Sequence, residues 1–342
     1  HLKPELGCGE DIKYRKFVKK EDKYLASILI DGMHQHVGLV KFFKLKRALP
    51  VSRFTLLDNY IKPLDVFSGI YWLSKGLLFS RKTKKKKYIF LDVDLTAYVH
   101  KELRISFSRI GRLMVMEKQL RRFFYYHHIE ELIYYLFEYP VGRLLSYVIG
   151  TSPKKPSRVG FQHGPASWIK MLHFLAPGEA CRNPPFLERA PIPDKILAED
   201  SASAEIYRHS GYEHVEVMDT IYRLDYLDDV KINAEQDRAL IVPGLHDGQL
   251  LLGIMKRFIE QHPKIICYFR PHPRANNSYV DVFDRFTNLE ITYDPMEELL
   301  QKVSRVFVTY SSVGVEASGL GLDVTIVDIP GKLNESPLLD RR

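Results

Sequence analysis

Two polar motifs in the C-terminal third of the chain carry side chains that can bind an anion. Phe269-Arg270-Pro271-His272-Pro273 and Thr309-Tyr310-Ser311-Ser312 each follow a strand-like run and precede helix-like sequence. At the carboxyl ends of strands in an open parallel sheet, loops and helix N-termini supply N–H donors and a positive dipole end. The two motifs therefore predict a nucleotide-phosphate site. Its predicted residues are Arg270, His272, Pro273, Arg274, Ser311, Ser312 and Glu316.

The same side chains also have purely structural interpretations. Ser311 could be the N-cap of the following helix, since serine is a favoured cap. Arg270 could be a surface charge at a strand end, and His272 could be a hydrogen-bonded loop histidine. We favour a binding role for all three residues, because the two cationic side chains cluster with the serine pair.

The elements that must position these motifs alternate between strands and helices, which indicates βαβ units and an α/β fold. C-terminal strands are expected at 238–242, 264–269, 305–309 and 323–327, with amphipathic helices at 248–261 and 295–303. N-terminal strands are expected at 24–31, 53–57, 88–92, 132–137, 159–163 and 195–198, and helices at 36–47, 61–80, 115–131 and 201–210. The helix over 61–80 is apolar enough to be buried. We expect two Rossmann-like domains, 1–230 and 231–342, joined by a polar linker over 226–237.

The composition indicates a folded enzyme-sized protein. Of 342 residues, 45% are hydrophobic, and no apolar run is long enough to span a bilayer. The net charge of +8 is concentrated in runs such as Arg81 to Lys87, which could be solvated loops or could contact an anionic membrane or a polyanionic acceptor. We slightly favour the solvated loop. Three widely spaced cysteines predict neither a disulfide framework nor a zinc site, so a reducing cytoplasm fits best. No signal peptide is visible, which by itself says little about location.

An ordered series of motifs resembles one enzyme family. The motifs are Gly160-Phe161-Gln162-His163-Gly164, Pro193 to Leu197, Ser210-Gly211-Tyr212, His272-Pro273, Ser311-Ser312 and Gly331 to Leu338. Over residues 130–340 this series resembles bacterial CMP-sugar-dependent glycosyltransferases, above all the retaining β-Kdo transferases of surface-carbohydrate biosynthesis. The first 120 residues carry little that can be matched.

The resemblance implies a GT-B architecture, in which two Rossmann-like domains enclose an interdomain donor cleft. It implies transfer of an acidic 2-keto sugar, most of all Kdo, from its CMP-activated donor to a glycan or lipid-linked glycan of a capsule, O-antigen or lipopolysaccharide. A cytoplasmic enzyme is expected, with peripheral contact to the inner face of the bacterial inner membrane as a further expectation. No metal, other cofactor or nucleic acid is expected. Two alternatives stay open: a non-catalytic GT-B-like carbohydrate-assembly partner, and a polyol-phosphate or sialic acid transferase.

Retaining transfer by double displacement needs a carboxylate nucleophile and an acid/base group, whereas inversion needs only a general base. Glu138 ends a strand pattern near Pro140, as in the relatives, and is the preferred acid/base, although it could be an exposed strand-end residue. Asp200 is the first candidate for the nucleophile and could equally be the N-cap of the helix over 201–210. The remaining catalytic candidates are Asp219 and Asp225 as rival nucleophiles, and His163 as a contact to the donor carboxylate or the acceptor hydroxyl.

Three weaker motifs complete the set. The segment from Asp31 to His36 contains His34 and His36, but two histidines at i and i+2 are weak evidence for zinc. It predicts an acceptor-side loop through Asp31, Gly32 and His34 rather than a metal site. The Asp92-Val93-Asp94-Leu95-Thr96 segment matches the DxDxT pattern of haloacid-dehalogenase-type phosphatases, but the pattern's partner residues are not found, so a coincidence is favoured. Asp247 is interpreted as the residue that opens the following helix.

Overall fold

The computed structural model describes residues 28–30, 54–176, 178–180, 190–233, 235–273, 275 and 286–341. Arg274 and the predicted acceptor-side residues Asp31, Gly32 and His34 lie outside these ranges, as does the helix expected over 36–47. The described chain forms two compact units. Residues up to Phe161, with 180 and 190–196, belong to the first unit, whereas Gln162–Glu179 and the chain from Leu197 onwards belong to the second.

A four-stranded parallel sheet has the order β5-β6-β7-β8. Its strands are β5 (Glu131–Tyr134), β6 (Ser157–Phe161), β7 (Lys195–Ala198) and β8 (Val215–Val217), and α5 (Pro140–Gly150) and α6 (Ser201–His209) connect them. Glu131 pairs with Ser157, and Tyr134 pairs with Gly160. A separate parallel pair joins β1 (Ile28–Ile30) to β2 (Phe54–Leu56) and is followed by η1 (Leu57–Tyr60). The strands predicted at 159–163 and 195–198 are confirmed to within two residues.

A five-stranded parallel sheet has the order β11-β10-β9-β12-β13. Its strands are β9 (Glu235–Val242), β10 (Ile266–Phe269), β11 (Leu289–Ile291), β12 (Val303–Val308) and β13 (Asp323–Ile326), joined by α7 (Gly248–Gln261), α9 (Met296–Lys302) and α10 (Val313–Gly319). The chain runs from β9 outwards to β11 and then returns to the other side of β9. The strand order therefore reverses between β9 and β12, which is where ligands bind in sheets of this kind.

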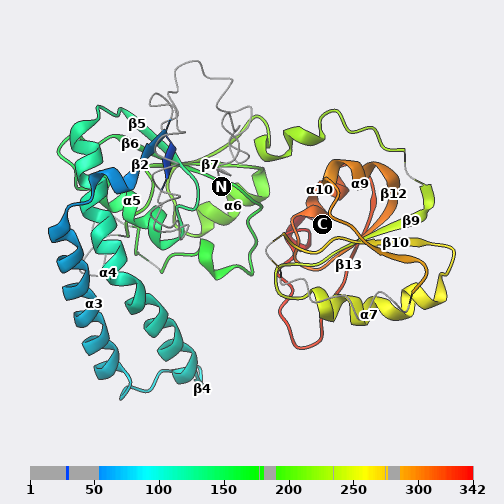
Figure 1. The fold of residues 1–342 in the computed structure, drawn as a ribbon, viewed down its shortest axis with the longest axis horizontal. Coiled ribbons are helices and arrows are strands. Elements are labelled where there is room, and N and C mark those ends of the chain that lie inside the picture. The colour runs from blue at the N-terminus through cyan, green and yellow to red at the C-terminus, as the bar shows by residue number, and fades with distance from the viewer. Residues whose placement is uncertain are drawn as a thin grey trace. The chain divides into compact units, whose positions relative to one another are not determined.

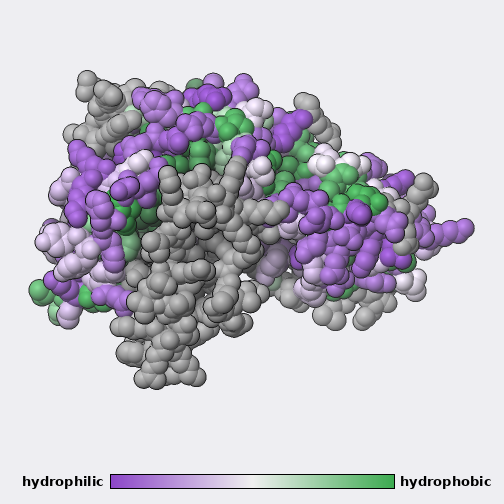
Figure 2. Space-filling model, turned by 90° about the horizontal axis from the view of Figure 1, so that it is seen from above, coloured by the Kyte–Doolittle hydropathy of each residue, from purple (hydrophilic) through white to green (hydrophobic). Residues whose placement is uncertain are grey.

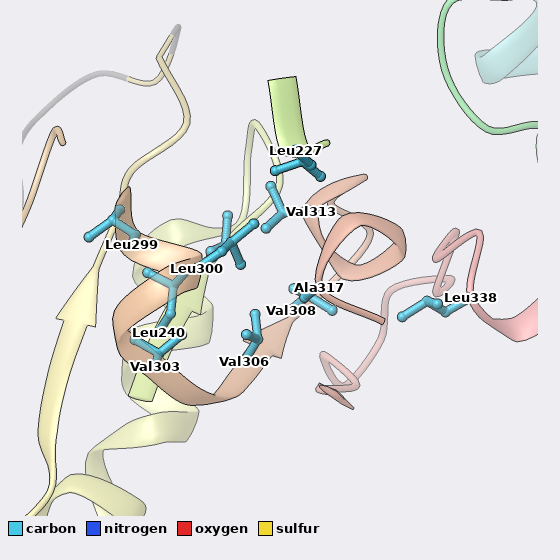
Figure 3. Close-up of a cluster of buried hydrophobic side chains, with 11 residues drawn as sticks. Leu227, Leu240, Leu299, Leu300, Val303, Val306, Val308, Val313, Ala317 and Leu338 are labelled. Carbon is cyan, nitrogen blue, oxygen red and sulfur yellow. The ribbon is translucent and has the colours of Figure 1, made fainter. Parts of the chain in front are cut away.

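The central strands of this sheet are buried on both faces, as continuous apolar runs in parallel sheets require. Side chains alternate between two cores: Leu240 and Val242 face α9 and α10, whereas Ala239 and Ile241 face α7. Figure 3 shows the first core, to which η3 (Tyr222–Leu227) contributes Leu227 and the C-terminal segment contributes Leu338. The helix predicted over 248–261 coincides with α7.

A long helical hairpin in the first unit consists of α3 (Pro63–Thr83) and α4 (Thr96–Tyr126), which extend side by side in Figure 1. The helix predicted over 61–80 is confirmed, but its predicted burial is wrong, because its large apolar side chains are exposed. Between the helices, β3 (Ile89–Phe90) and β4 (Val93–Asp94) form a short antiparallel turn. Asp92 therefore lies in a hairpin turn and not at the end of a parallel strand, which argues against the phosphatase pattern. None of the described helices is long and apolar enough to cross a membrane.

Candidate functional site

Two loops meet where the strand order of the five-stranded sheet reverses. The loop after β9 donates from the Gly244 N–H to Thr309 Oγ1 at 3.0 Å and from the His246 N–H to the Tyr310 hydroxyl at 3.2 Å. The Tyr310 ring lies against Gly244, where an added Cβ would come within 2.2 Å of its Cζ. Only glycine leaves room for this ring. These two hydrogen bonds and this ring contact fix the β9 loop against the Tyr310-Ser311-Ser312 loop after β12.

The third loop of this edge follows β10, the neighbour of β9 on the other side. The Arg270 N–H donates to Ile241 O at 3.0 Å, which continues the sheet, and its Nε donates to Asp294 O at 2.8 Å, which orients the guanidinium. His272 is half-buried, and its carbonyl accepts from the Ala275 N–H at 2.8 Å. The predicted cationic residues and the serine pair therefore end two strands that flank β9 at the same edge of one sheet.

The serine hydroxyls are not used as strong helix caps. Ser312 occupies the N-cap position of α10, but its side chain makes no capping hydrogen bond. Ser311 Oγ accepts from the Val313 N–H at 3.4 Å, which is a long contact for an N–H···O bond. Both side chains are half-buried. This geometry leaves the two hydroxyls with bonding capacity for a ligand.

Asp247 is a residue whose importance the sequence did not reveal. It occupies the N-cap position of α7, as expected, but its carboxylate does not cap the helix. The side chain is only 1% exposed, and neither carboxylate oxygen has a hydrogen-bond partner within the described part of the chain. Burial raises the pKa of Tyr310, and the negative charge of Asp247 adds to this shift. A buried carboxylate without donors is costly, which makes Asp247 a candidate ligand contact.

At the end of β7, Asp200 confirms the capping interpretation that the sequence left open. Its Oδ1 accepts from the Ser203 N–H at 2.7 Å at the start of α6. Its Oδ2 accepts from Arg341 Nε at 3.0 Å and from Arg341 Nη2 at 2.8 Å. Burial raises the pKa of Asp200, but the bonds from Ser203 and Arg341 outweigh this effect and hold it below its ordinary value. Asp200 would have to break these bonds before it could attack a sugar.

The neighbouring Glu199 belongs to a buried ionic network. Arg223 Nε donates to Glu199 Oε1 at 2.6 Å, and Arg223 Nη1 donates to Glu316 Oε1 at 3.2 Å. Glu316 Oε2 also accepts from the Tyr226 hydroxyl at 2.6 Å. Glu316 was predicted as a nucleotide-binding residue. It is 7% exposed, and its two carboxylate oxygens bond to Arg223 and to Tyr226 within this network. Burial raises the pKa of Glu199 despite the nearby Arg223, because removing a carboxylate from water disfavours its charged form.

His163 follows β6 on a loop that is held rigidly from both sides. Gln162 is 2% exposed and donates from Nε2 to Gly164 O at 2.7 Å and to Ser203 Oγ at 3.0 Å. Its Oε1 accepts from the Glu199 N–H at 2.8 Å. His163 itself is half-buried. The hydrogen bonds of Gln162 thus anchor the loop that carries His163, and an imidazole at this position has the chemistry for proton transfer.

The other carboxylate candidates differ in exposure. Glu138 is 6% exposed and follows β5 in a tight turn, in which Leu136 has a φ of 59°. An added Cβ at Gly142 would lie 2.2 Å from Leu136 O, so the turn packs directly on α5. Asp219 is exposed and accepts from the Tyr222 hydroxyl at 2.7 Å, whereas Asp225 is 8% exposed within η3.

Comparisons with known proteins identify the fold of this chain, but they do not assign it to a sequence family. No protein-family model and no curated protein matches the sequence. A structure of UDP-GlcNAc 2-epimerase from Neisseria meningitidis bound to UDP-GlcNAc matches with a TM-score of 0.50 and 11% identity, over 92% of this chain and 78% of that chain. The wall teichoic acid polymerase TagF matches with a TM-score of 0.30 and 14% identity, over 55% of this chain and 59% of that chain. The chain is an α/β protein with two parallel sheets and a GT-B-like fold.

Proposed function

We propose that this protein is a glycosyltransferase that moves an acidic 2-keto sugar, Kdo above all, from a CMP-activated donor to a cell-surface glycan or lipid-linked glycan. One observation supports it most. The Arg270-Pro271-His272 loop and the Tyr310-Ser311-Ser312 loop end strands on either side of β9, where the strand order of the sheet reverses. Cations, hydroxyls and backbone donors at such an edge suit a nucleotide phosphate. The motif series that resembles CMP-sugar transferases supports the sugar class.

In the proposed donor site, each residue has a different role in binding or stabilising the nucleotide. Arg270 and His272 stabilise the negative charge that develops on the departing CMP phosphate, and Ser311 and Ser312 donate hydroxyl hydrogen bonds to it. A carboxylate accepts hydrogen bonds and donates none. Asp247 therefore binds a hydroxyl or amino group of the donor, such as the ribose hydroxyls or the cytosine amino group.

Catalysis in this proposal uses groups that follow strands of the four-stranded sheet. His163 or Glu138 takes the proton of the acceptor hydroxyl while the bond between the anomeric carbon and the CMP phosphate breaks, and CMP leaves with the bonding electrons. Retention would also require a carboxylate nucleophile. Since Asp200 is held by Ser203 and Arg341, the exposed Asp219 becomes the first candidate for that role.

A donor panel tests this function. The protein is incubated with CMP-Kdo, CMP-sialic acid, a CDP-linked polyol and UDP-GlcNAc, and nucleotide release is measured with and without glycan acceptors. We expect CMP release from CMP-Kdo that rises when an acceptor is added. Release from the CDP-linked polyol or from UDP-GlcNAc alone would overturn the assignment of the donor. The absence of turnover with all four donors, together with measurable CMP binding, would favour the non-catalytic alternative.

A further inference from the structure

The outer face of α3 is an apolar surface of unusual extent. Seven large apolar side chains on it are about half exposed or more. They are Leu64, Val66, Phe67, Ile70, Tyr71, Leu77 and Leu78, with Leu64 76% exposed, Phe67 68% and Ile70 59%. On the face of the molecule that Figure 2 presents, grey atoms aside, hydrophobic residues gather only in small patches among hydrophilic ones. A contiguous apolar face of this length marks an interaction surface.

This exposure follows from how α3 packs on α4. The residues that α3 buries include Gly69 and Gly76, which face α4. An added Cβ at Gly69 would lie 2.7 Å from Val115 Cγ2, and one at Gly111 would lie 2.5 Å from Gly69 O, so the two backbones approach closely. At 3.6 residues per turn, the exposed apolar positions fall on the side of α3 away from this glycine stripe. An ordinary surface helix does the reverse and turns its large apolar residues inwards.

The tip of the hairpin is also apolar. In the β3–β4 turn, Ile89 and Phe90 are each 64% exposed, Leu91 is 81% exposed and Val93 is 57% exposed. The turn is held in place by hydrogen bonds from the Leu95 N–H to Tyr88 O at 2.9 Å and from the Thr96 N–H to Asp94 Oδ1 at 2.8 Å. These apolar side chains therefore project from an ordered turn.

Positive charge lies beside this apolar surface. Arg81, Lys82, Lys84, Lys85, Lys86 and Lys87 are all exposed at the C-terminal end of α3 and in the link to the β3–β4 turn. The acidic residues at the tip are Asp92 and Asp94, and Asp94 is bonded to Thr96. The excess of cations next to large apolar side chains matches an anionic bilayer surface, where lipid headgroups meet acyl chains.

We propose that the outer face of α3 and the β3–β4 turn dock onto an anionic lipid bilayer, with the Arg81–Lys87 cluster among the headgroups. This inference is independent of the proposed transferase activity, because it rests on the hairpin alone. A helix of 21 residues is about 30 Å long and would lie along the interface. The docking would hold the enzyme near lipid-linked molecules.

Vesicle co-sedimentation tests the docking. The full chain is mixed with vesicles of phosphatidylcholine alone or with added phosphatidylglycerol, and binding is expected only to the anionic vesicles. Phe67→Ser/Ile70→Ser should lower the partition coefficient on the order of 100-fold. Lys84→Ala/Lys85→Ala should lower it about five-fold for each lysine, and the loss should shrink at high salt. The matched control is Leu250→Ser/Ile254→Ser on α7, where the two side chains are 47% and 39% exposed.

Circular dichroism and thermal unfolding establish that each variant is folded. Equal vesicle binding by Phe67→Ser/Ile70→Ser and the α7 control would overturn the proposal. So would a wild-type protein that ignores anionic vesicles but self-associates in light scattering, with the self-association abolished by Phe67→Ser/Ile70→Ser. That result would make a second copy of the chain the partner of this face.

Discussion

Arg223→Ala is expected to lower the free energy of unfolding by about 3–5 kcal/mol, because it leaves Glu199 and Glu316 buried without their shared cation. The Arg223 side chain is 9% exposed and bonds to both carboxylates. Urea unfolding measures the change. Arg305→Ala is the matched control, since its nearest contact with Asp323 is 3.9 Å long and the two side chains are 48% and 70% exposed. This control should change stability by less than about 1 kcal/mol.

The pH dependence of this loss identifies its cause. Burial already raises the pKa of Glu199, and Arg223 opposes that shift. Removing Arg223 raises the folded-state pKa further above the unfolded value. A carboxyl group with a raised folded-state pKa contributes stability at low pH, and that stability is lost as pH rises through the folded-state pKa. The deficit of Arg223→Ala should therefore grow from acidic to alkaline pH. An equal deficit at every pH would mean that lost packing, not the uncompensated carboxylates, causes it.

His163→Ala is expected to lower the rate of sugar transfer by about 10²–10⁴-fold, the usual contribution of one acid/base group. His163 follows β6, and its neighbour Gln162 is bonded to Gly164 O and to the Glu199 N–H. The variant should stay folded, since the Gln162 bonds that anchor this loop remain in place. Rates are measured at saturating donor, so that altered binding does not contribute.

Asp200→Asn provides the contrasting variant. Asparagine keeps the cap of α6 but loses the ion pair with Arg341. Because Asp200 has a structural role in our account, its asparagine variant should transfer sugar within a few-fold of the wild-type rate. A folded but inactive Asp200→Asn protein would restore Asp200 as the nucleophile. A fully active His163→Ala protein would remove His163 from the mechanism.

The parts of the fold that the sequence predicted are those with strong local patterns. Ala239 to Val242 form a buried apolar run, and the amphipathic period over 248–261 matches α7 along its whole length. The shorter elements β8, β11 and α5 were not predicted, although Pro140 at the first position of α5 is a helix-start signal. The helix predicted over 115–131 misses the first half of α4, because charged residues after Thr96 interrupt the apolar pattern.

The features that sequence reasoning missed depend on tertiary contacts. Glu199 and Arg223 each resemble an ordinary surface charge in the sequence, and Glu316 was predicted at the nucleotide and not in an ionic network. The sequence does not bring them together, because 93 positions separate Arg223 from Glu316. The position of Asp247 at a helix start follows from sequence, but the sequence does not show that its carboxylate is buried and makes no capping bond. The apolar positions of α3 predicted burial, because a sequence does not show that glycines carry the contact with α4.

Calorimetric titration of CMP in EDTA tests the central claim, that the edge formed by the β9, β10 and β12 loops binds the donor nucleotide. We expect the wild-type protein to bind, and His272→Ala to bind about 10- to 100-fold more weakly, which is the cost of losing a hydrogen bond to a charged group. Asp247→Asn should also bind more weakly, because an amide cannot replace both acceptor oxygens of the carboxylate. His262→Ala, at the far end of α7, should match the wild type in affinity. Unchanged CMP affinity in both His272→Ala and Asp247→Asn would contradict the account.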